Sequence, residues 1–263
     1  MPAEAACGYA SLNVVVVVKD SVIYTSVVGR YDLLMQPAVT DSDFDYVCFV
    51  GKGEKHSDRI GVWQIREVPY ESRDPRIVSR FPKINPHLVF PDCRYSVWLD
   101  GNVAITGGYA YSVFKEKIRS GALYSGMKHW QRDCAYDEAY ACINARKDNF
   151  FDIVRTLKFL KDENFPRHFG LYENNVIFRR HNDPAVMNFD SMWWECYLGH
   201  VHRDQILHPY CMLKCGMGFD YLLPEPYCAR NHDAFLYRDH IGRRSLFPRL
   251  VATQISRIVS RFI

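Results

Sequence analysis

The sequence predicts one α/β domain in which a mixed central sheet is flanked by helices. Short apolar runs rich in β-branched residues alternate with longer segments that can form helices, which is typical of an α/β sheet. A chain of 263 residues suits one large domain better than two small ones. No low-complexity linker and no internal repeat divides it. We therefore expect one domain over residues 1–240.

The first half of the chain carries four predicted strands, over residues 22–28, 46–50, 62–68 and 95–99. Each is a short apolar run bounded by turn residues, and the first ends at Gly29. The fourth leads directly into Asp100-Gly101-Asn102. A return to strand is predicted later, over residues 176–178.

The middle of the chain is predicted to be helical. Residues 135–146 are rich in helix formers, and Asp148 is the expected cap of a helix whose apolar residues recur at helical spacing up to residue 160. Asp183 followed by Pro184 predicts a helix start, with Gly199 as its stop. A further short helix is expected over residues 204–214.

The tail, residues 241–263, is predicted to be a basic amphipathic helix. Its apolar residues form one stripe, while Arg249, Arg257 and Arg261 lie off the stripe. Such a helix can dock on its own domain, on a second copy of the chain or on a membrane surface. We favour docking on the domain or a partner subunit.

Charge and cysteine usage narrow the function. A net charge of +3 gives no sign of the concentrated basic face of nucleic-acid-binding proteins, but it suits a cleft for a small anion. Nine cysteines, an odd number, and no N-x-S/T acceptor indicate a reducing compartment. The apolar run at residues 14–18 is too short to span a membrane. We therefore expect a cytoplasmic protein.

The segment WLDGN, ending at Asn102, is the most informative motif. In open α/β sheets, ligands bind beyond the carboxyl ends of strands. Asp100 and Asn102 offer two oxygen ligands there, which suits Mg²⁺ or Mn²⁺ bridging to a diphosphate. The same tripeptide also makes an ordinary turn.

A basic trio precedes this motif. Arg76, Arg80 and Lys83 are spaced by about one helical turn, so a helix would align them on one face. Cations beside a metal site suit a diphosphate or the attached sugar. We expect Arg80 and Lys83 to contact this ligand, while Arg76 stays open between this role and a solvated helix face.

Several ordered motifs resemble one family along nearly the whole chain. The chain is similar to the glycosyltransferase-like domain family that includes plant mucilage-related and anther-expressed proteins, with bacterial and viral members. The similar segments include VIYTSVVGRYDLL, DYVCFV, WQIREV, DPRIVSRFPKINPHLVFPDCRYSVWLDGN, HWQRDCAYDEAYACI, FPRHFGLYENNVIFRRHNDP and WWECYLGHVHRDQILHPY.

This resemblance implies a GT-A-like, Rossmann-like fold that takes a nucleotide-diphosphate sugar, with a UDP-sugar as the default donor. It implies transfer to a glycan or glycoconjugate acceptor with Mn²⁺ or Mg²⁺. The implied metal ligands are Asp100, Asn102 and a late histidine, for which His240 is preferred over His232. Asn102 stands where many transferases have a second Asp, so it can contact the sugar instead.

The resemblance also implies most of the remaining site residues. The donor nucleotide would contact the loop after the first strand, at Thr25, Val27 and Tyr31, and also Gly101. Acceptor or sugar contacts are expected by resemblance from His129, Arg132 and Arg203. Glu173, Asn174 and Asn175 are expected there from their own chemistry, because such polar side chains bind sugar hydroxyl groups, although they also commonly form turns. Asp204 and Gln205 are similar to a pair near the reacting centre of glycogenin-like transferases. Asp204 is therefore the first candidate for a general base or for contact with the donor sugar, with Asp133 as a further catalytic candidate.

Two other functions stay open. A metal-dependent amide hydrolase is one, because plant relatives have been described as ceramidase-like, although no HExxH motif occurs. A nucleotide-sugar-binding module without catalysis is the other, because Asn102 weakens the predicted metal site.

Overall fold

The computed structural model describes residues 19–29 and 33–238. The predicted tail helix and two predicted site residues, Tyr31 and His240, lie outside this part of the chain, so the boundary at residue 240 stays a prediction.

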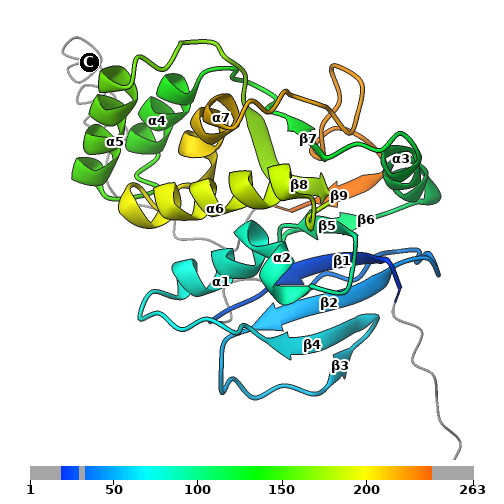
Figure 1. The fold of residues 1–263 in the computed structure, drawn as a ribbon. Coiled ribbons are helices and arrows are strands. Elements are labelled where there is room, and N and C mark those ends of the chain that lie inside the picture. The colour runs from blue at the N-terminus through cyan, green and yellow to red at the C-terminus, as the bar shows by residue number, and fades with distance from the viewer. Residues whose placement is uncertain (1–18, 30–32, 239–263) are drawn as a thin grey trace, which may run out of the picture.

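A seven-stranded sheet in the order β3-β4-β2-β1-β5-β8-β7 forms the centre of the molecule (Figure 1). Its strands are β1 (Ser21–Ser26), β2 (Asp45–Val50), β3 (Arg59–Ile60), β4 (Trp63–Glu67), β5 (Tyr95–Leu99), β7 (Tyr124–Lys128) and β8 (Tyr172–Arg179). Neighbours β4, β2, β1 and β5 run parallel, whereas β8 runs antiparallel to both β5 and β7. A separate antiparallel pair joins β6 (Val103–Ile105) to β9 (Phe235–Tyr237).

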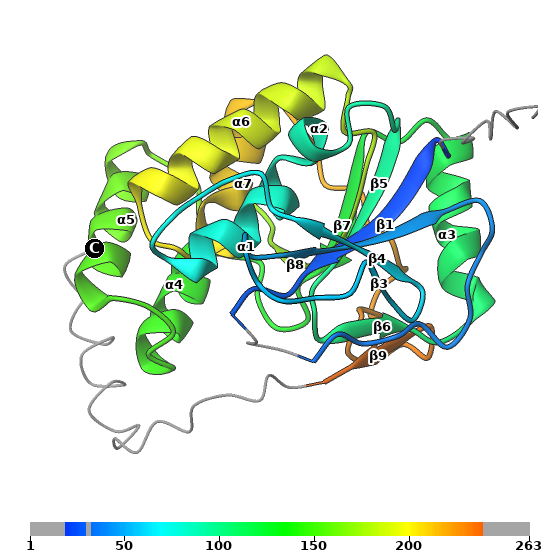
Figure 2. The ribbon, with the colours of Figure 1, turned by 90° about the horizontal axis from the view of Figure 1, so that it is seen from below.

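The helices cover both faces of the large sheet. They are α1 (Pro75–Ile84), α2 (Pro86–Val89), α3 (Gly108–Arg119), α4 (Ala135–Asn144), α5 (Phe150–Asp162), α6 (Pro184–Gly199) and α7 (Asp204–Lys214). Helices α1, α2 and α6 lie on one face, and α3 lies on the other (Figures 1 and 2). The predicted mixed α/β sheet with flanking helices is therefore confirmed.

Two apolar cores form because successive side chains of a strand point to opposite faces. On β1, Val22 and Tyr24 belong to the core beneath α1 and α6, while Ile23 belongs to the core beneath α3. On β5, Trp98 joins the first core, and its neighbours Val97 and Leu99 join the second. Both faces of the central strands are thus buried, as parallel strands require.

Local capping explains where the helices begin. Asp183 accepts a hydrogen bond from the backbone N–H of Ala185, and Pro184 occupies the first helical position of α6, as predicted. Asp74 and Pro75 play the same parts for α1. The predicted cap of α5 was wrong by one residue. Asn149 accepts the capping bonds, while Asp148 pairs with Arg76.

The last predicted strand was too short. β8 spans eight residues, all of them buried, and includes Glu173, Asn174 and Asn175, which were expected to precede it. Glu173 pairs with Met127 of β7, and the carbonyl of Asn175 accepts a hydrogen bond from Asp100 N, the residue after β5, at 2.8 Å. Within the described residues, no helix has the length and apolar character needed to cross a bilayer.

Candidate functional site

The predicted metal motif lies at the sheet edge where parallel strands end. Asp100 directly follows β5, and its carbonyl accepts a hydrogen bond from Val103 N at 2.9 Å, which closes the Asp100–Asn102 turn. Asp100 N donates to Asn175 O at 2.8 Å, so the turn is fixed to the first half of β8. Gly101 is half-buried at the middle of this turn.

Lys83 joins two carboxylates that are far apart in the sequence. Its Nζ lies 3.1 Å from Asp100 Oδ1 and 2.6 Å from Asp204 Oδ2. Trp98 Nε1 also donates to Asp100 Oδ1, at 2.7 Å. Only 1% of the Lys83 side chain is exposed. We expected Lys83 to contact the donor, but the structure buries it as the cation that positions both acids.

The charges around Asp204 keep its carboxylate ionised. Burial alone would raise the pKa of Asp204, but Lys83, Arg80 and Arg203 outweigh burial and hold that pKa well below its usual range. Asp204 is also the first residue of α7, where the helix dipole favours a negative charge. The pKa of Asp100 is lowered as well, because Lys83 and Arg80 overcome its burial.

The basic trio of α1 divides between two environments. Arg80 Nε lies 3.3 Å from Asp204 Oδ2, with 29% of its side chain exposed, so it can also reach a ligand. Arg76 is instead bound to Asp74 and Asp148 at the exposed start of the helix. The structure therefore assigns Arg76 to a surface ion pair and brings only Arg80 and Lys83 to the site.

A buried ion pair holds the end of α1 over the sheet. Arg179 Nη2 donates to the carbonyl of Lys83 at 2.7 Å, and its Nη1 lies 3.1 Å from Asp190 Oδ1. Both side chains are buried, and burial raises the pKa of Asp190 to about 7, although Arg179 opposes that rise. This pair fixes the backbone from which Lys83 reaches its two carboxylates.

Oxygen atoms suited to a metal ion lie beside the turn. Among the described residues, Lys83 and Trp98 both contact the Asp100 carboxylate through Oδ1. Asn102 Nδ2 donates to Arg238 O at 2.7 Å, and Asn102 Oδ1 is buried with no hydrogen-bond partner among the described residues. Glu173 Oε2 is likewise buried without a partner in the described part of the chain. Hard divalent cations bind such carboxylate and amide oxygens, so these residues fit the implied metal.

A different group of ligand types also occurs among the described residues. Atoms of Cys134, Asp137 and His168 that could bind a metal lie within 4.8 Å of one another. Cys134 is buried, Asp137 is half-buried and His168 is exposed. This group shares no residue with the ligands predicted from the sequence, and its residue types alone do not identify a metal.

The predicted residues after β7 form a separate polar group. His129 Nδ1 accepts hydrogen bonds from the backbone N–H groups of Gln131 and Arg132. Arg132 Nε donates to the buried Glu138 at 2.7 Å. Asp133, a catalytic candidate, is 58% exposed and pairs with His168 at 2.8 Å. The structure therefore places Asp133 in this exposed pair, whereas Lys83 joins Asp100 and Asp204.

The remaining candidates lie on β8 and at the start of α7, where their side chains donate to backbone carbonyls that connect these two elements near Asp204. Asn174 Nδ2 donates to the carbonyl of Asp204 at 3.4 Å, and Gln205 Nε2 donates to that of Tyr172 at 2.8 Å. Arg203 is the residue before α7, is half-buried and lowers the pKa of Asp204. Both side-chain polar atoms of Asn175 are buried without a hydrogen bond of normal geometry to any described residue, although its side chain is close enough to Glu173 to oppose the burial that raises the pKa of that acid.

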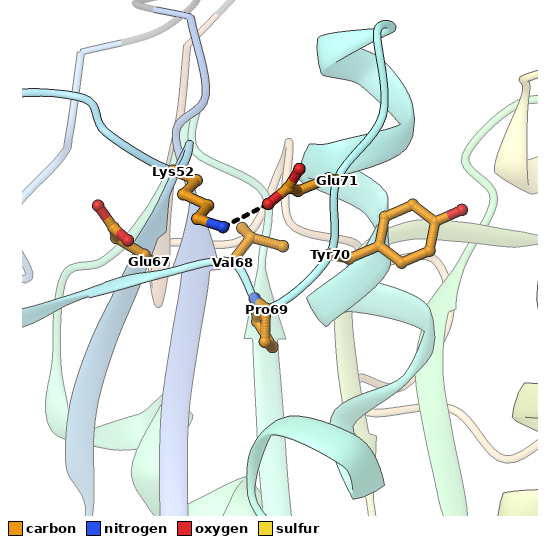
Figure 3. A pocket seen from close by; sticks show the side chains of 6 residues that line it. All are labelled: Lys52, Glu67, Val68, Pro69, Tyr70 and Glu71. Atoms are coloured by element: carbon orange, nitrogen blue, oxygen red, sulfur yellow. Dashed lines mark hydrogen bonds and ion pairs between the residues drawn. The ribbon is translucent and has the colours of Figure 1, made fainter.

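A cavity of about 360 Å³ lies at the same sheet edge, beside the carboxyl ends of β2 and β4 (Figure 3). It is lined by Lys52, Glu67, Val68, Pro69, Tyr70 and Glu71. Figure 3 shows Lys52 paired with Glu71 across it. Hydrogen bonds join this region to the loop after β1, because Glu54 Oε1 accepts from Gly29 N and Glu67 Oε1 accepts from Gly53 N.

The two described donor candidates of that loop are placed at the end of β1. Thr25 is buried, with no hydrogen-bond partner for Oγ1. Val27 N donates to Phe49 O at 2.8 Å, which ties the loop to β2.

Sequence reasoning missed residues that come from the far end of the chain. Arg230 forms an ion pair with Glu173, and its guanidinium lies 3.8 Å from the ring centre of Tyr237. Neither residue belongs to a motif, and no local spacing links them to β8. Once the structure shows Glu173 buried, its charge requires a cation nearby, but the sequence did not reveal that burial.

Comparison with known proteins identifies relatives. The model of the TOD1/MUCI70, glycosyltransferase-like domain family matches residues 13–224. A relative described as probable hexosyltransferase MUCI70, from Arabidopsis thaliana, is 27% identical over 167 residues. The match covers 59% of this chain and 28% of that relative, so the chain matches well under half of the relative's length. These findings confirm the family resemblance drawn from the motifs.

Proposed function

Because the chain belongs to the TOD1/MUCI70 glycosyltransferase-like domain family, we propose that it transfers a hexose from a nucleotide-diphosphate sugar to a carbohydrate hydroxyl group with a divalent metal ion. The hexose follows from the description of the relative, and a UDP-sugar is the default donor for this fold class. The observation that carries the proposal is the pairing of Asp100 and Asp204 through buried Lys83, at the sheet edge where open α/β folds bind ligands.

The donor would lie along this edge. The cavity at β2 and β4 has a volume within the range of ligand pockets, while the ring of Tyr70 points away from Lys52 and Glu71 and stacks on Phe81 (Figure 3). Arg80, partly exposed and on the same helix as Lys83, supplies positive charge for the diphosphate. The donor sugar would then lie toward Asp100 and Asp204.

Asp100 and Asn102 would hold the metal ion, with His240 as a further predicted ligand. Mn²⁺ or Mg²⁺ bound there supplies positive charge that offsets the charge growing on the departing nucleotide diphosphate. Lys83 and Trp98 fix Asp100 Oδ1, so the carboxylate is oriented before any ligand arrives. Such preorganisation avoids reorganising the site during the reaction.

Asp204 is better suited to electrostatic stabilisation than to proton removal. Its Oδ2 contacts both Lys83 and Arg80, and a carboxylate held so firmly by cations is a weak base. Positive charge develops on the sugar ring in glycosyl transfer, and a fixed carboxylate favours that charge. We propose this role for Asp204, with Gln205 beside it, and leave the stereochemical course open.

A thermal-shift panel tests the proposal. UDP-, GDP- and ADP-hexoses, each with and without Mn²⁺, are added to wild type and to Asp100→Ala. A donor at 100 times its Kd stabilises the native state by about 2.7 kcal/mol, or a rise in Tm of roughly 5–10 °C. We expect one donor to give this rise only with Mn²⁺, and Asp100→Ala to abolish it.

Asp162→Ala is the matched control, because Asp162 is an exposed acid paired with Lys158 at the end of α5. It should keep the full donor response. If no nucleotide sugar changes the Tm of wild type, the donor site is refuted. Cleavage of an amide substrate would then favour the hydrolase, whereas donor binding without release of the nucleotide diphosphate would favour the binding module.

A further inference from the structure

Trp130 is unusual among the tryptophans of this protein. Trp63, Trp98 and Trp193 are buried and Trp194 is partly buried, whereas Trp130 is 53% exposed. It lies in the loop after β7, next to the buried His129. Exposure of one aromatic residue is common by itself, but a tryptophan ring that stays half in water beside polar residues is available to pack against a ligand.

A chain of contacts links Trp130 to the centre of the site. The guanidinium of Arg230 lies 5.8 Å from the ring centre of Trp130 and 3.8 Å from that of Tyr237. Arg230 Nε donates to Glu173, which is buried on β8. Two residues along the same strand, the Asn175 carbonyl accepts the N–H of Asp100.

The second aromatic residue is fixed to the predicted metal turn. Tyr237 on β9 pairs with Val103, the residue after Asn102. Asn102 and Arg238 exchange two hydrogen bonds, from Arg238 N to Asn102 O at 3.0 Å and from Asn102 Nδ2 to Arg238 O at 2.7 Å. Tyr237 and Arg230 are therefore held beside the site by the fold and are not a chance surface contact.

The chemistry of these three residues suits a sugar ring. A pyranose has an apolar face of C–H groups that packs on an aromatic ring, and hydroxyl groups around its rim. A guanidinium has five N–H donors, of which Arg230 uses the one on Nε for Glu173 and a further hydrogen bond for Tyr237. Arg230 thus has donors for hydroxyl groups beside the ring that would support the sugar.

The acceptor and the donor would bind at different positions along the carboxyl ends of the strands. The cavity proposed for the nucleoside lies at β2 and β4, whereas Trp130 and Arg230 belong to the side of β8 and β7. The charged cluster at Asp100 lies between them. Arg230 and Tyr237 also lie beyond residue 224, where the family match ends, and acceptor sites are where proteins of one fold differ.

We propose that Trp130, Arg230 and Tyr237 form an acceptor subsite for a carbohydrate chain, with one sugar ring stacked on Trp130 and hydrogen-bonded by Arg230. This inference rests on the proposed transferase function and specifies its acceptor as an oligosaccharide or polysaccharide.

Binding of defined oligosaccharides tests the subsite. The probes are β-1,4-linked tetrasaccharides of galactose, glucose, xylose and mannose, measured by calorimetry with wild type, Trp130→Ala and Trp130→Phe. We expect wild type to bind at least one of them, Trp130→Ala to weaken that binding about tenfold or more, and Trp130→Phe to stay within about threefold. Phe151→Ala removes an aromatic side chain that is 76% exposed on α5 and should bind as wild type does.

The donor response of the same variants separates the two proposals. Trp130→Ala should keep the Tm rise with nucleotide sugar and Mn²⁺, because the donor lies on the other side of Asp100. If wild type shows the donor response but no tetrasaccharide binds, or Trp130→Ala binds as tightly as wild type, the acceptor subsite is refuted and the transferase proposal stands. If wild type lacks the donor response, the transferase proposal itself fails.

Discussion

Lys83 shows how one buried cation can organise two acids. An unpaired ammonium group would be very costly in the interior, so its burial is stable only with partners of opposite charge. Asp100 and Asp204 are those partners, at 3.1 and 2.6 Å. The cost of burying the ion pair is balanced by the attraction in a medium of low dielectric constant. Lys83 therefore positions the two carboxylates together. Because both contact the same ammonium group, the position of each carboxylate depends on the other.

The hydrogen bonds that His129 accepts require its imidazole ring to be neutral. Its Nδ1 accepts two backbone N–H groups, at 3.1 Å from Gln131 N and 2.9 Å from Arg132 N, so this nitrogen carries no proton. Burial lowers the pKa of His129 to about 4, and nearby Glu138 only partly opposes this. Protonation would break both accepted bonds and would add a charge to a buried ring.

The stability of the protein should therefore fall in acid partly through His129. Between pH 6.5 and pH 4 the unfolded chain takes up a proton at this residue and the folded chain does not, so the free energy of unfolding decreases as pH falls. His129→Asn can accept the same backbone bonds but does not titrate. From pH 7 to pH 5, urea unfolding should show wild type losing up to about 2 kcal/mol more than His129→Asn. Parallel pH profiles would contradict this account.

At the scale of elements, β8 marks the limit of prediction from the sequence. The residues Glu173, Asn174 and Asn175 have low strand propensity, so the pattern predicted a strand only from residue 176. The pairing of Glu173 with β7 and the hydrogen bond from Asp100 N to Asn175 O extend the strand against that propensity, and all three residues are buried. Helix starts such as Asp183-Pro184 were predicted correctly because capping depends on residues adjacent in the sequence.

The candidate site also has one part that the local sequence predicts and another part that it does not. The Asp100 turn follows from a strand ending in polar residues, which is local. The contact of Lys83 with Asp204 joins residues 121 positions apart, and no spacing rule predicts it. Asp133 was chosen from a motif, and its exposed pair with His168 is equally beyond local reasoning.

Helix α1 allows a test of whether its N-terminal cap affects the site residues near its other end. Asp74 caps it by accepting from Arg76 N at 2.8 Å, while Arg80 and Lys83 lie near its other end. Asp74→Ala should lower the free energy of unfolding by about 1 kcal/mol, measured by urea denaturation. The donor-induced rise in Tm should persist, because Arg179 holds the carbonyl of Lys83 independently of the cap.

Asp74→Asn is the matched comparison, since asparagine caps helices about as well as aspartate. It should cost much less than Asp74→Ala. Equal losses in both variants would assign the effect to the ion pair between Asp74 and Arg76 instead of the cap.

At the scale of the whole molecule, the sheet sets the order of the functional parts. The cavity lies at β2 and β4, the paired carboxylates lie at β5 and α7, and the exposed aromatic residue follows β7. Four inter-strand spacings separate β2 from β7 in the sheet, which corresponds to roughly 19 Å. Cores on both faces keep this order fixed, so donor and acceptor sides should behave as separate units that meet at Asp100.

Double-mutant cycles on kcat/KM for the transfer reaction test that separation. Lys52→Ala acts in the donor cavity and Trp130→Ala at the acceptor side, so their effects on the activation free energy should add within about 0.5 kcal/mol. Lys83→Met and Asp204→Asn break the same buried contact, so the double variant should lose much less than the sum of the two single losses. Coupling of more than about 1 kcal/mol between Lys52 and Trp130 would contradict the separation, because it would require the edge of the sheet to rearrange as one unit when either substrate binds.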